Sequence, residues 1–288
     1  MIDAVIVTHG QADLVSRAVE SLRQSEPVLA SMTIVDTAAD TDVDNLQYDE
    51  TLEATVIKRP ENPGFGAAAN IGIEVGEAPL VLVANSDTWA HPGAVAKLAR
   101  VLEESPDAAC AGPLLLNTDG SPQDSAFAFP GIGQAVFDLV PLPDRLRGSR
   151  LNGRRWSKTK PIDVNYVLGA FMLFRRRAIQ LVGAFAPEYW MYSEEIDICR
   201  RFCSAGWRVI HVPLAHVTHI RAASTFDRDL ELLPQLYRSR ARWYRSHRAL
   251  PISYLALALM WIALTVRARL PGPRRGAYAA ARAALRSD

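Results

Sequence analysis

Apolar runs and amphipathic segments alternate along the first hundred residues of this 288-residue chain. Short runs rich in Val, Ile and Leu are typical of strands buried in a parallel sheet, and apolar residues at every third or fourth position are typical of helices. Such alternation closes as right-handed βαβ units. It therefore predicts an α/β fold with a mostly parallel mixed sheet flanked by helices. The expected strands are residues 4–8, 32–36, 54–58 and 80–84, and the expected helices are 12–24, 67–75 and 92–103.

The polar segment Asn85, Ser86 and Asp87 closes the last of these apolar runs. Ligands of open α/β sheets bind outside the carboxyl ends of the strands, where a carboxylate can hold a divalent cation that bridges a diphosphate. An Asx-type turn that caps the next helix explains the same residues without a ligand. Asp36 ends its own strand in the same way, within reach of a nucleobase or ribose, and a turn or cap is again the alternative.

A second acidic cluster, Glu194, Glu195 and Asp197, opens a helix expected at residues 193–205. Ser193 can cap this helix while the acids complement the positive end of its dipole, which is a sufficient structural explanation. The functional explanation comes from the aromatic neighbours, because apolar surroundings raise the basicity of a carboxylate as a general base requires. These neighbours are Tyr189, Trp190 and Tyr192.

Between the two halves, residues 116–161 are rich in Pro, Gly, Ser and Arg and have little periodicity. A loop of this length in a compact domain is usually a lid or a substrate-binding excursion. Beyond it, strands are expected at 164–168, 170–174 and 207–212 and a helix at 175–182, with Val217–His219 closing the globular part.

The chain starts without a secretory signal, and its three cysteines fit a reducing cytosol better than a disulfide framework. Its charge is unevenly distributed. Residues 237–288 carry eleven arginines, no lysine and one acid, so their formal charge is +10, whereas the rest of the chain carries 21 basic and 30 acidic residues, or −9. This asymmetry predicts an anionic partner for the basic C-terminal extension.

Residues 249–266 of that extension carry no charge at all. We expect a helix that lies at a membrane interface, with Trp261 at the boundary and arginines reaching lipid phosphates rather than nucleic acid. A buried packing helix and a true membrane span are the alternatives.

Read in order, the motifs resemble a family 2 glycosyltransferase of the GT-A fold, in the rhamnosyltransferase-like branch. The resemblance covers roughly residues 1–248 and is carried by Thr8, Val35–Asp36 and the segments 62–70, 85–87, 112–113, 119–120, 169–176, 182–185, 191–199, 205–207 and 212–219.

The resemblance implies a GT-A catalytic domain at residues 1–227, with a nucleotide-sugar-binding half at 1–115 and an acceptor and catalytic half at 116–227. Residues 228–288 would form a helical, Arg-rich, membrane-associating extension. It implies Glu195 as the catalytic base and Asp87 and His219 as the holders of Mg²⁺ or Mn²⁺. The implied donor-binding residues are Thr8, Asp36, Asn62, Gly64, Asn70, Asn85, Ser86 and Asp87, and the implied acceptor-binding residues are Gly169, Trp190, Tyr192 and Glu194.

The implied activity is an inverting, metal-dependent transfer of a sugar from a nucleotide diphosphate-sugar to a hydroxyl of a cell-envelope glycan or a polyprenyl-diphosphate-linked acceptor. L-Rhamnose from dTDP-rhamnose is the donor that the branch favours. The enzyme would be cytoplasmic and peripherally bound to the inner face of the bacterial cell membrane. A catalytically inactive protein of the same fold that binds nucleotide-sugars or acts as a scaffold is the alternative.

Overall fold

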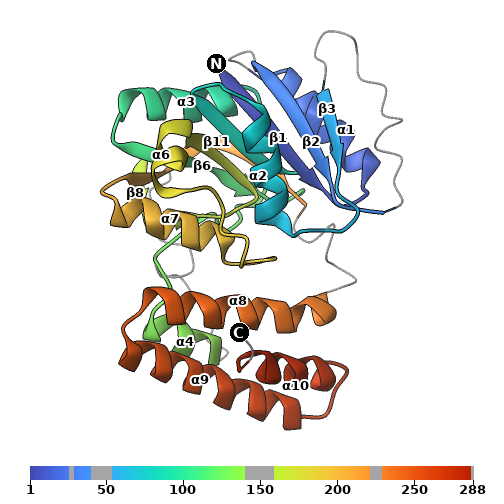
Figure 1. Ribbon diagram of the computed structural model, residues 1–288, viewed down its shortest axis with the longest axis vertical. Helices are drawn as coiled ribbons and strands as arrows, with labels where there is room; N and C mark the ends of the chain where they lie inside the picture. The colour runs from blue at the N-terminus through green and yellow to red at the C-terminus, as the bar shows by residue number, and fades with distance from the viewer. Residues whose placement is uncertain (26–28, 40–53, 140–158, 221–228, 287–288) are drawn as a thin grey trace.

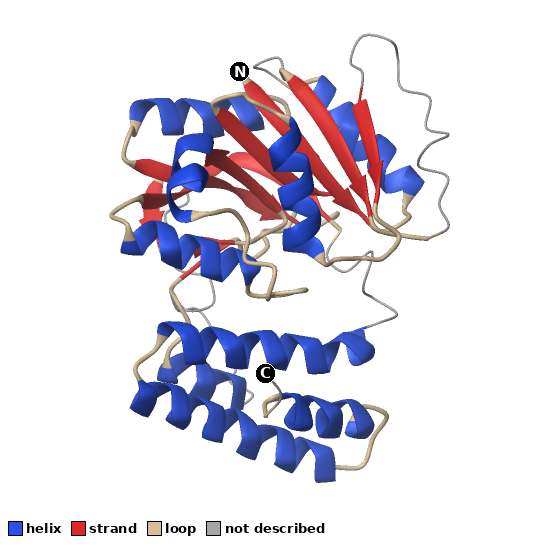
Figure 2. Ribbon diagram, viewed as in Figure 1, coloured by secondary structure: helices blue, strands red, loops and turns tan. Residues whose placement is uncertain are grey.

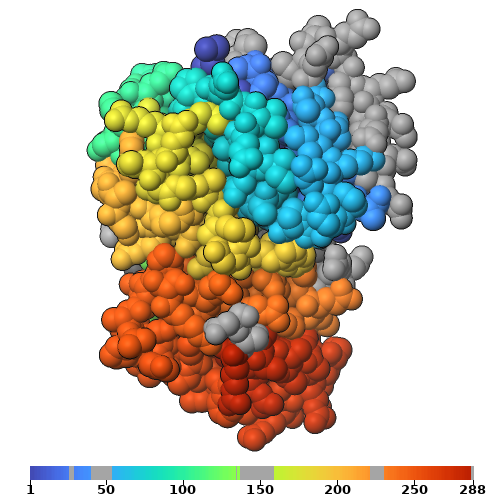
Figure 3. All heavy atoms as spheres, viewed as in Figure 1, coloured from blue at the N-terminus to red at the C-terminus, as the bar shows by residue number. Residues whose placement is uncertain are grey.

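The chain folds into an α/β part and a layer of helices packed beneath it (Figures 1 and 2). This computed structural model describes residues 1–25, 29–39, 54–139, 159–220 and 229–286. The helical layer consists of α4 (Ile132–Leu139), α8 (Asp229–His247), α9 (Leu250–Arg269) and α10 (Arg275–Ala284). In the space-filling view the two layers abut one another (Figure 3).

Four strands form the parallel half of the main sheet. Their spatial order is β3 (Ala54–Lys58), β2 (Ser31–Asp36), β1 (Ile2–Thr8) and β4 (Leu80–Asn85). Thr8 is in register with Asp36, and Val7 with Asn85. Because parallel strands end at the same edge of a sheet, the polar residues that close these strands lie side by side there.

The other half of the sheet is mixed. β10 (Phe171–Arg175) runs antiparallel between β4 and β6 (Ala108–Leu116), and β11 (Arg208–His219) pairs in parallel with β6. The short strands β5 (Thr88–Ala90) and β8 (Ile162–Val164) are antiparallel to β11, and β7 (Ala126–Phe127) pairs with β9 (Tyr166–Val167) in a separate two-stranded ladder. The predicted mostly parallel mixed sheet is therefore confirmed.

Helices cover both faces of the sheet and divide the core in two. α1 (Ala12–Arg23) and α3 (Ala94–Glu104) share one cluster of buried apolar residues. The other cluster contains residues of α2 (Phe65–Val75), α6 (Arg176–Val182) and α7 (Glu194–Ser204). This second cluster continues without a break into the helical layer through Trp243 and Tyr244 of α8 and Met260 of α9. The helical layer thus shares its core with the face of the sheet that carries α7.

Several elements differ from the sequence-based expectations. β6 was not expected, because its residues Ala108–Leu116 combine small side chains with Gly and Pro, which weaken a strand pattern. β11 runs on to His219, passing Pro213 through a register shift between Val212 and His216. The expected excursion at residues 116–161 contains β7 and α4, and α4 packs against α9. Residues 140–158 of the excursion and the expected domain boundary at 227–228 lie outside the described residues.

Candidate active site

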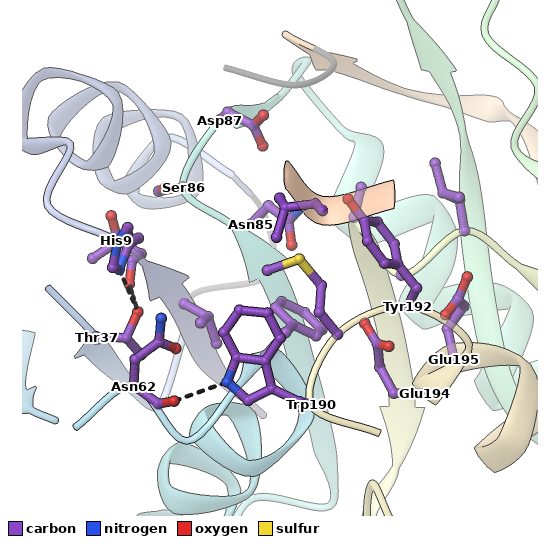
Figure 4. A pocket seen from close by; sticks show the side chains of 18 of the residues that line it. His9, Thr37, Asn62, Asn85, Ser86, Asp87, Trp190, Tyr192, Glu194 and Glu195 are labelled. Carbon is purple, nitrogen blue, oxygen red and sulfur yellow. Dashed lines mark hydrogen bonds between the residues drawn. The ribbon is translucent and has the colours of Figure 1, made fainter. Parts of the chain in front are cut away.

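A cavity of about 420 Å³ opens at the carboxyl ends of the parallel strands (Figure 4). It brings together most of the residues that the sequence singled out, from both halves of the α/β part. These are Thr8, Asn62, Asn85, Ser86, Asp87, Gly169, Trp190, Tyr192, Glu194, Glu195 and His219. Asp87 lies at one end of the group and Glu195 at the other (Figure 4).

Asp87 and His219 form a buried pair at the first end. The Oδ1 atom of Asp87 has no hydrogen-bond partner and lies 3.5 Å from Nε2 of His219. The backbone joins the two residues, because His219 is in register with Thr88 and Ile220 donates its N–H to the Asp87 carbonyl at 2.9 Å. Asp87 does not cap the next helix: β5 intervenes, and Gly93 occupies the N-cap position of α3. The capping part of the structural alternative is therefore wrong for Asp87, although Ser86 and Asp87 do form the turn between β4 and β5.

Gln123 sets the orientation of the His219 ring. Its side-chain Nε2 donates to the His219 carbonyl at 2.6 Å, and its Oε1 lies 3.0 Å from His219 Nδ1. Because the amide nitrogen already faces the carbonyl, Oε1 is the acceptor and Nδ1 carries the ring proton. In the neutral ring, Nε2 then presents a lone pair toward the Asp87 carboxylate. Metal-binding histidines are commonly oriented by a hydrogen bond at the other ring nitrogen.

Two electron-rich atoms that face each other in a buried site fit a divalent cation better than they fit one another. Among the described residues, His, Cys, Asp and Glu side chains form no cluster of three or more that could hold a metal ion. Asp87 and His219 thus fit Mg²⁺ or Mn²⁺ only as a partial set, which phosphate and water oxygens would complete.

Glu194 and Glu195 occupy the first turn of α7 at the other end of the cavity. Burial raises the pKa of Glu194 well above its usual range, and the charge of Glu195 adds to the effect. Burial also raises the pKa of Glu195 to about 7, against the opposing influence of backbone N–H groups at the helix start and of Arg240 on α8. A carboxylate that titrates near neutral pH suits general base catalysis.

The turn before α7 has a strained backbone. Tyr192 and Ser193 have φ values of 68° and 70°, in the left-handed region that side chains other than glycine rarely adopt. Ser193 makes no capping hydrogen bond with its side chain, so the prediction that it caps the helix in this way is wrong. Consecutive residues in this region persist only where their surroundings hold them.

Gly64 allows the Trp190 loop to approach the start of α2. Its φ is +92°, and a Cβ atom at this position would overlap the Trp190 carbonyl, which accepts the Phe65 N–H at 3.0 Å. The Trp190 indole in turn donates to the Asn62 carbonyl at 2.9 Å. Gly169 likewise leaves room for side chains of α7, since a Cβ there would lie 3.3 Å from Cβ of Glu195.

Asp36, Gly64 and Asn70 do not line the cavity, although the sequence singled them out as donor-binding residues. Oδ1 of the buried Asp36 accepts the N–H groups of Gly10 and Ala38 at 3.2 and 3.1 Å. The Asn70 amide exchanges two hydrogen bonds with the Phe185 backbone, at 2.7 and 3.0 Å.

Several cavity residues were not predicted: His9, Thr37, Phe65, Met191 and Leu232 line the cavity, and Gln123 supports it. His9 and Thr37 contact each other at 3.1 Å. Each directly follows a predicted strand end, a signal that was available in the sequence. Leu232 belongs to α8, and no local pattern places that helix at the cavity.

A family model described as glycosyltransferase like family 2 matches residues 4–246 of the chain. A curated relative, the N-acetylglucosaminyl-diphospho-decaprenol L-rhamnosyltransferase of Mycobacterium tuberculosis, is 32% identical over 203 residues. That match covers 63% of this chain and 66% of the relative, so it spans slightly less than two thirds of the relative's length.

Two solved structures share the fold. The mannosyltransferase PcManGT from Pyrobaculum calidifontis, in complex with GDP-Man and Mn²⁺, has a TM-score of 0.60 and 15% identity, covering 99% of this chain and 79% of that chain. GalNAc-T7 with UDP, GalNAc and Mn²⁺ also has a TM-score of 0.60 and 15% identity, covering 85% of this chain and 48% of that chain. At this identity the likeness concerns the fold alone, and it confirms the predicted GT-A architecture.

We predict that Gly64→Ala disrupts the cavity whereas Gly120→Ala does not. Both glycines have positive φ, so both substitutions cost about 1–3 kcal/mol of backbone strain. Only Gly64 faces a neighbouring carbonyl, while a Cβ at Gly120 meets nothing within 4 Å. Gly64→Ala should therefore lose more free energy of unfolding in denaturant titrations and should also weaken binding of a nucleotide diphosphate. Equal losses in the two variants would contradict this view of the Trp190 loop.

Proposed function

Because this chain belongs to the glycosyltransferase-like family 2, we propose that it is a glycosyltransferase that moves a sugar from a nucleotide diphosphate donor to a hydroxyl of a polyprenyl-linked acceptor. One observation carries the proposal. The Asp87 and His219 pair and the Glu194 and Glu195 pair line the same cavity of about 420 Å³. A cavity of this size is of the order that holds a small ligand and its reacting partner.

Glu195 is the proposed catalytic base. It removes the proton from an acceptor hydroxyl, whose oxygen attacks the anomeric carbon of the donor sugar. The bond from that carbon to the diphosphate oxygen breaks, the electron pair leaves with the nucleotide diphosphate, and the configuration at the carbon is inverted. The proton ends on Glu195, whose raised pKa makes it a competent acceptor near neutral pH. Burial raises the pKa of Glu194 beside it well above its usual range, and we propose that Glu194 contacts the acceptor instead of acting as the base.

Asp87 and His219 are the proposed holders of Mg²⁺ or Mn²⁺. A divalent cation bound there offsets the charge that grows on the leaving diphosphate. The buried Oδ1 of Asp87 and the ring orientation set by Gln123 support this assignment. The strand ends at Thr8, Asn85 and Ser86 then face the nucleotide.

The proposed donor is dTDP-rhamnose and the proposed acceptor a polyprenyl-diphosphate-linked sugar. The name of the Mycobacterium tuberculosis relative describes transfer of L-rhamnose to N-acetylglucosaminyl-diphospho-decaprenol. Tyr192 near Glu195, and Trp190 between Glu194 and Asn62, offer aromatic surfaces to an acceptor sugar (Figure 4). Asp36 remains the proposed contact for the nucleobase of the donor, which it would approach beside His9 and Thr37.

We further propose that α9 docks the enzyme on an anionic membrane surface, at the inner face of the cell membrane. α9 has 20 residues with a mean hydropathy of 1.6, and one third of its apolar window is buried. One side packs into the shared core through Ala256, Met260 and Leu264. The other side forms an apolar stripe of exposed residues: Leu250, Tyr254, Leu255, Trp261, Ile262, Val266 and Leu270.

Charge complements this apolar stripe. Arg282 and Arg286 of the α10 region lie 5.9 and 5.7 Å from the Trp261 ring, and Arg269 is exposed at the end of α9. An apolar face flanked by arginines is typical of helices that lie at a lipid headgroup boundary. The two alternatives explain less. If α9 only packed against the protein, its exposed apolar stripe would have no role, and if it spanned the membrane, its buried side could not pack into the shared core.

We predict that Glu195→Gln lowers kcat by about 10²–10⁴, the usual worth of one general base. Glu188→Gln is the matched control, because Glu188 is exposed and does not line the cavity. In the wild type the base acts in its deprotonated form, so kcat should fall as the pH drops below about 7, the pKa of Glu195. Turnover of dTDP-rhamnose by Glu195→Gln at the wild-type rate would remove the base from the mechanism. No transfer by the wild type with any donor would favour an inactive nucleotide-sugar-binding protein.

We predict that Asp87→Asn weakens the joint binding of dTDP and Mn²⁺. At 100 times its Kd, a ligand raises the free energy of unfolding by about 2.7 kcal/mol, and a tenfold weaker Kd lowers that gain by about 1.4 kcal/mol. Thermal unfolding with dTDP, with and without Mn²⁺, measures this gain. Asp107→Asn, which removes an exposed carboxylate paired with Arg208, should behave as the wild type. An unchanged Mn²⁺-dependent gain in Asp87→Asn would show that the metal is held elsewhere.

We predict that Ile262→Ser weakens binding to vesicles of anionic lipid by about tenfold, since burying an Ile side chain is worth about 1.5–3 kcal/mol. Leu214→Ser is the control, because Leu214 is 48% exposed on β11 and Ile262 is 49% exposed on α9. Co-sedimentation at increasing salt should also show weaker binding as the arginines are screened. Equal binding of both variants would exclude the stripe as the docking face.

A further inference from the structure

Helix α8 contacts the segment that carries Glu194 and Glu195 at two points, one on each side of the two acids. The Ser239 hydroxyl donates to the Met191 carbonyl at 2.7 Å, and Nε2 of His247 lies 2.7 Å from Oδ1 of Asp197. Both contacts come from the helical layer: the first reaches Met191, which lines the cavity, and the second reaches α7 two residues after Glu195.

In the first contact Ser239 is buried, and both the oxygen and the hydrogen of its hydroxyl have partners. Ser239 is 2% exposed, and the Gln235 amide donates to its oxygen at 3.1 Å, which leaves the hydroxyl hydrogen for the Met191 carbonyl. Leu232 lies seven residues before Ser239 and therefore on the same face of α8. Because Leu232 lines the cavity, the face of α8 that closes the cavity is also the face that fixes Met191.

The strained turn lies between the two contacts. Met191 is followed by Tyr192 and Ser193, whose left-handed φ values set the direction in which α7 starts. No side-chain cap stabilises this start. The hydrogen bond to the Met191 carbonyl therefore opposes relaxation of the turn toward a less strained backbone.

The second contact holds α7 itself. One oxygen of Asp197 meets His247, and the other accepts a hydrogen bond from Nε of Arg201 at 2.8 Å. Arg201 also donates to the carbonyls of Val182, Gly183 and Ala184. Asp197 therefore ties the first turn of α7 to α8 on one side and to the loop after α6 on the other.

We propose that α8 is a positioning element of the active site, in which Ser239 and His247 fix the turn and the helix start that aim Glu195 into the cavity. The proposal rests on the function proposed above, because it assigns these residues a role in the placement of the base. It also makes the C-terminal helical layer part of the catalytic unit and not solely a membrane-docking layer.

The test compares Ser239→Ala and His247→Ala with the matched control Thr265→Val. Thr265 also lies buried in the helical layer and also donates its hydroxyl to a backbone carbonyl at 2.7 Å, that of Trp261, but it is remote from α7. His247→Gln is the rescue variant, since its amide can donate to Asp197 in place of the ring. Each full-length variant is assayed with dTDP-rhamnose for kcat, for donor KM and for the pH dependence of kcat, and its folded fraction is measured by circular dichroism.

We expect kcat per folded molecule to fall by about tenfold to 10² in Ser239→Ala and His247→Ala, the cost of misplacing a catalytic group by about 1 Å. Donor KM should stay near the wild-type value, because the donor end of the cavity is untouched. The acid limb of the pH profile should move to lower pH, since a Glu195 carboxylate that has moved toward solvent loses part of the burial that raises its pKa. Its other charged neighbours, Glu194 and Arg240, are present in every variant. Thr265→Val and His247→Gln should keep the wild-type profile.

Two results would overturn the inference and leave the proposed function standing. One is a wild-type kcat and pH profile in both alanine variants alongside an inactive Glu195→Gln. The other is a loss of activity that matches the loss of folded protein in the alanine variants and in Thr265→Val alike, with no movement of the acid limb. A fully active Glu195→Gln would instead contradict the proposed function itself.

Discussion

The parallel hydrogen bonding of β1 to β2 and to β4 determines where the polar groups of the donor end lie. It aligns the ends of three strands, so that Thr8, Asp36 and Asn85 reach the same edge without any long-range side-chain contact. The backbone then carries Asp87 one step beyond that edge, where the antiparallel pairing of β5 with β11 brings His219 to it. A one-residue slip in either pairing would turn these side chains to the opposite face of the sheet.

The other end of the cavity is built at a cost in stability. Glu194 is buried and Glu195 is half-buried beside it, and the turn that precedes them is strained at Tyr192 and Ser193. The N–H groups at the start of α7 compensate part of this cost, as helix starts do for negative charge. Two features farther away support this arrangement: Gly64 leaves room for the Trp190 carbonyl, and Ser239 donates a hydrogen bond to the Met191 carbonyl. In the proposed mechanism, residues that do not line the cavity would therefore influence how basic and how well aimed the Glu195 carboxylate is.

The sequence predicted what local patterns encode. Asp87 and Glu195 follow, respectively, a buried strand run and an aromatic segment that opens a helix, so local patterns singled out both residues. The family resemblance then assigned them to one site, and the structure brings both to one cavity. Gln123, Leu232 and Ser239 were beyond such reasoning. Gln123 lies in a segment whose apolar residues follow no helix or strand period. Leu232 and Ser239 come close to the cavity only because α8, which follows the α/β part in the sequence, packs against it. Ser193 shows the opposite failure, because a residue typical of helix caps adopts a left-handed backbone instead.

The apolar core that passes without interruption from the sheet through Trp243 into α9 has a geometric consequence. If the stripe of α9 rests on a bilayer, α8 becomes a spacer of one helix layer, about 10 Å thick, between the lipid surface and the cavity. The enzyme would then select acceptors by length, because an acceptor hydroxyl reaches the cavity only when its distance from the anchoring lipid matches that thickness. Headgroups too short to reach past the spacer, or so long that they overshoot it, would be rejected by geometry before any sugar is recognised.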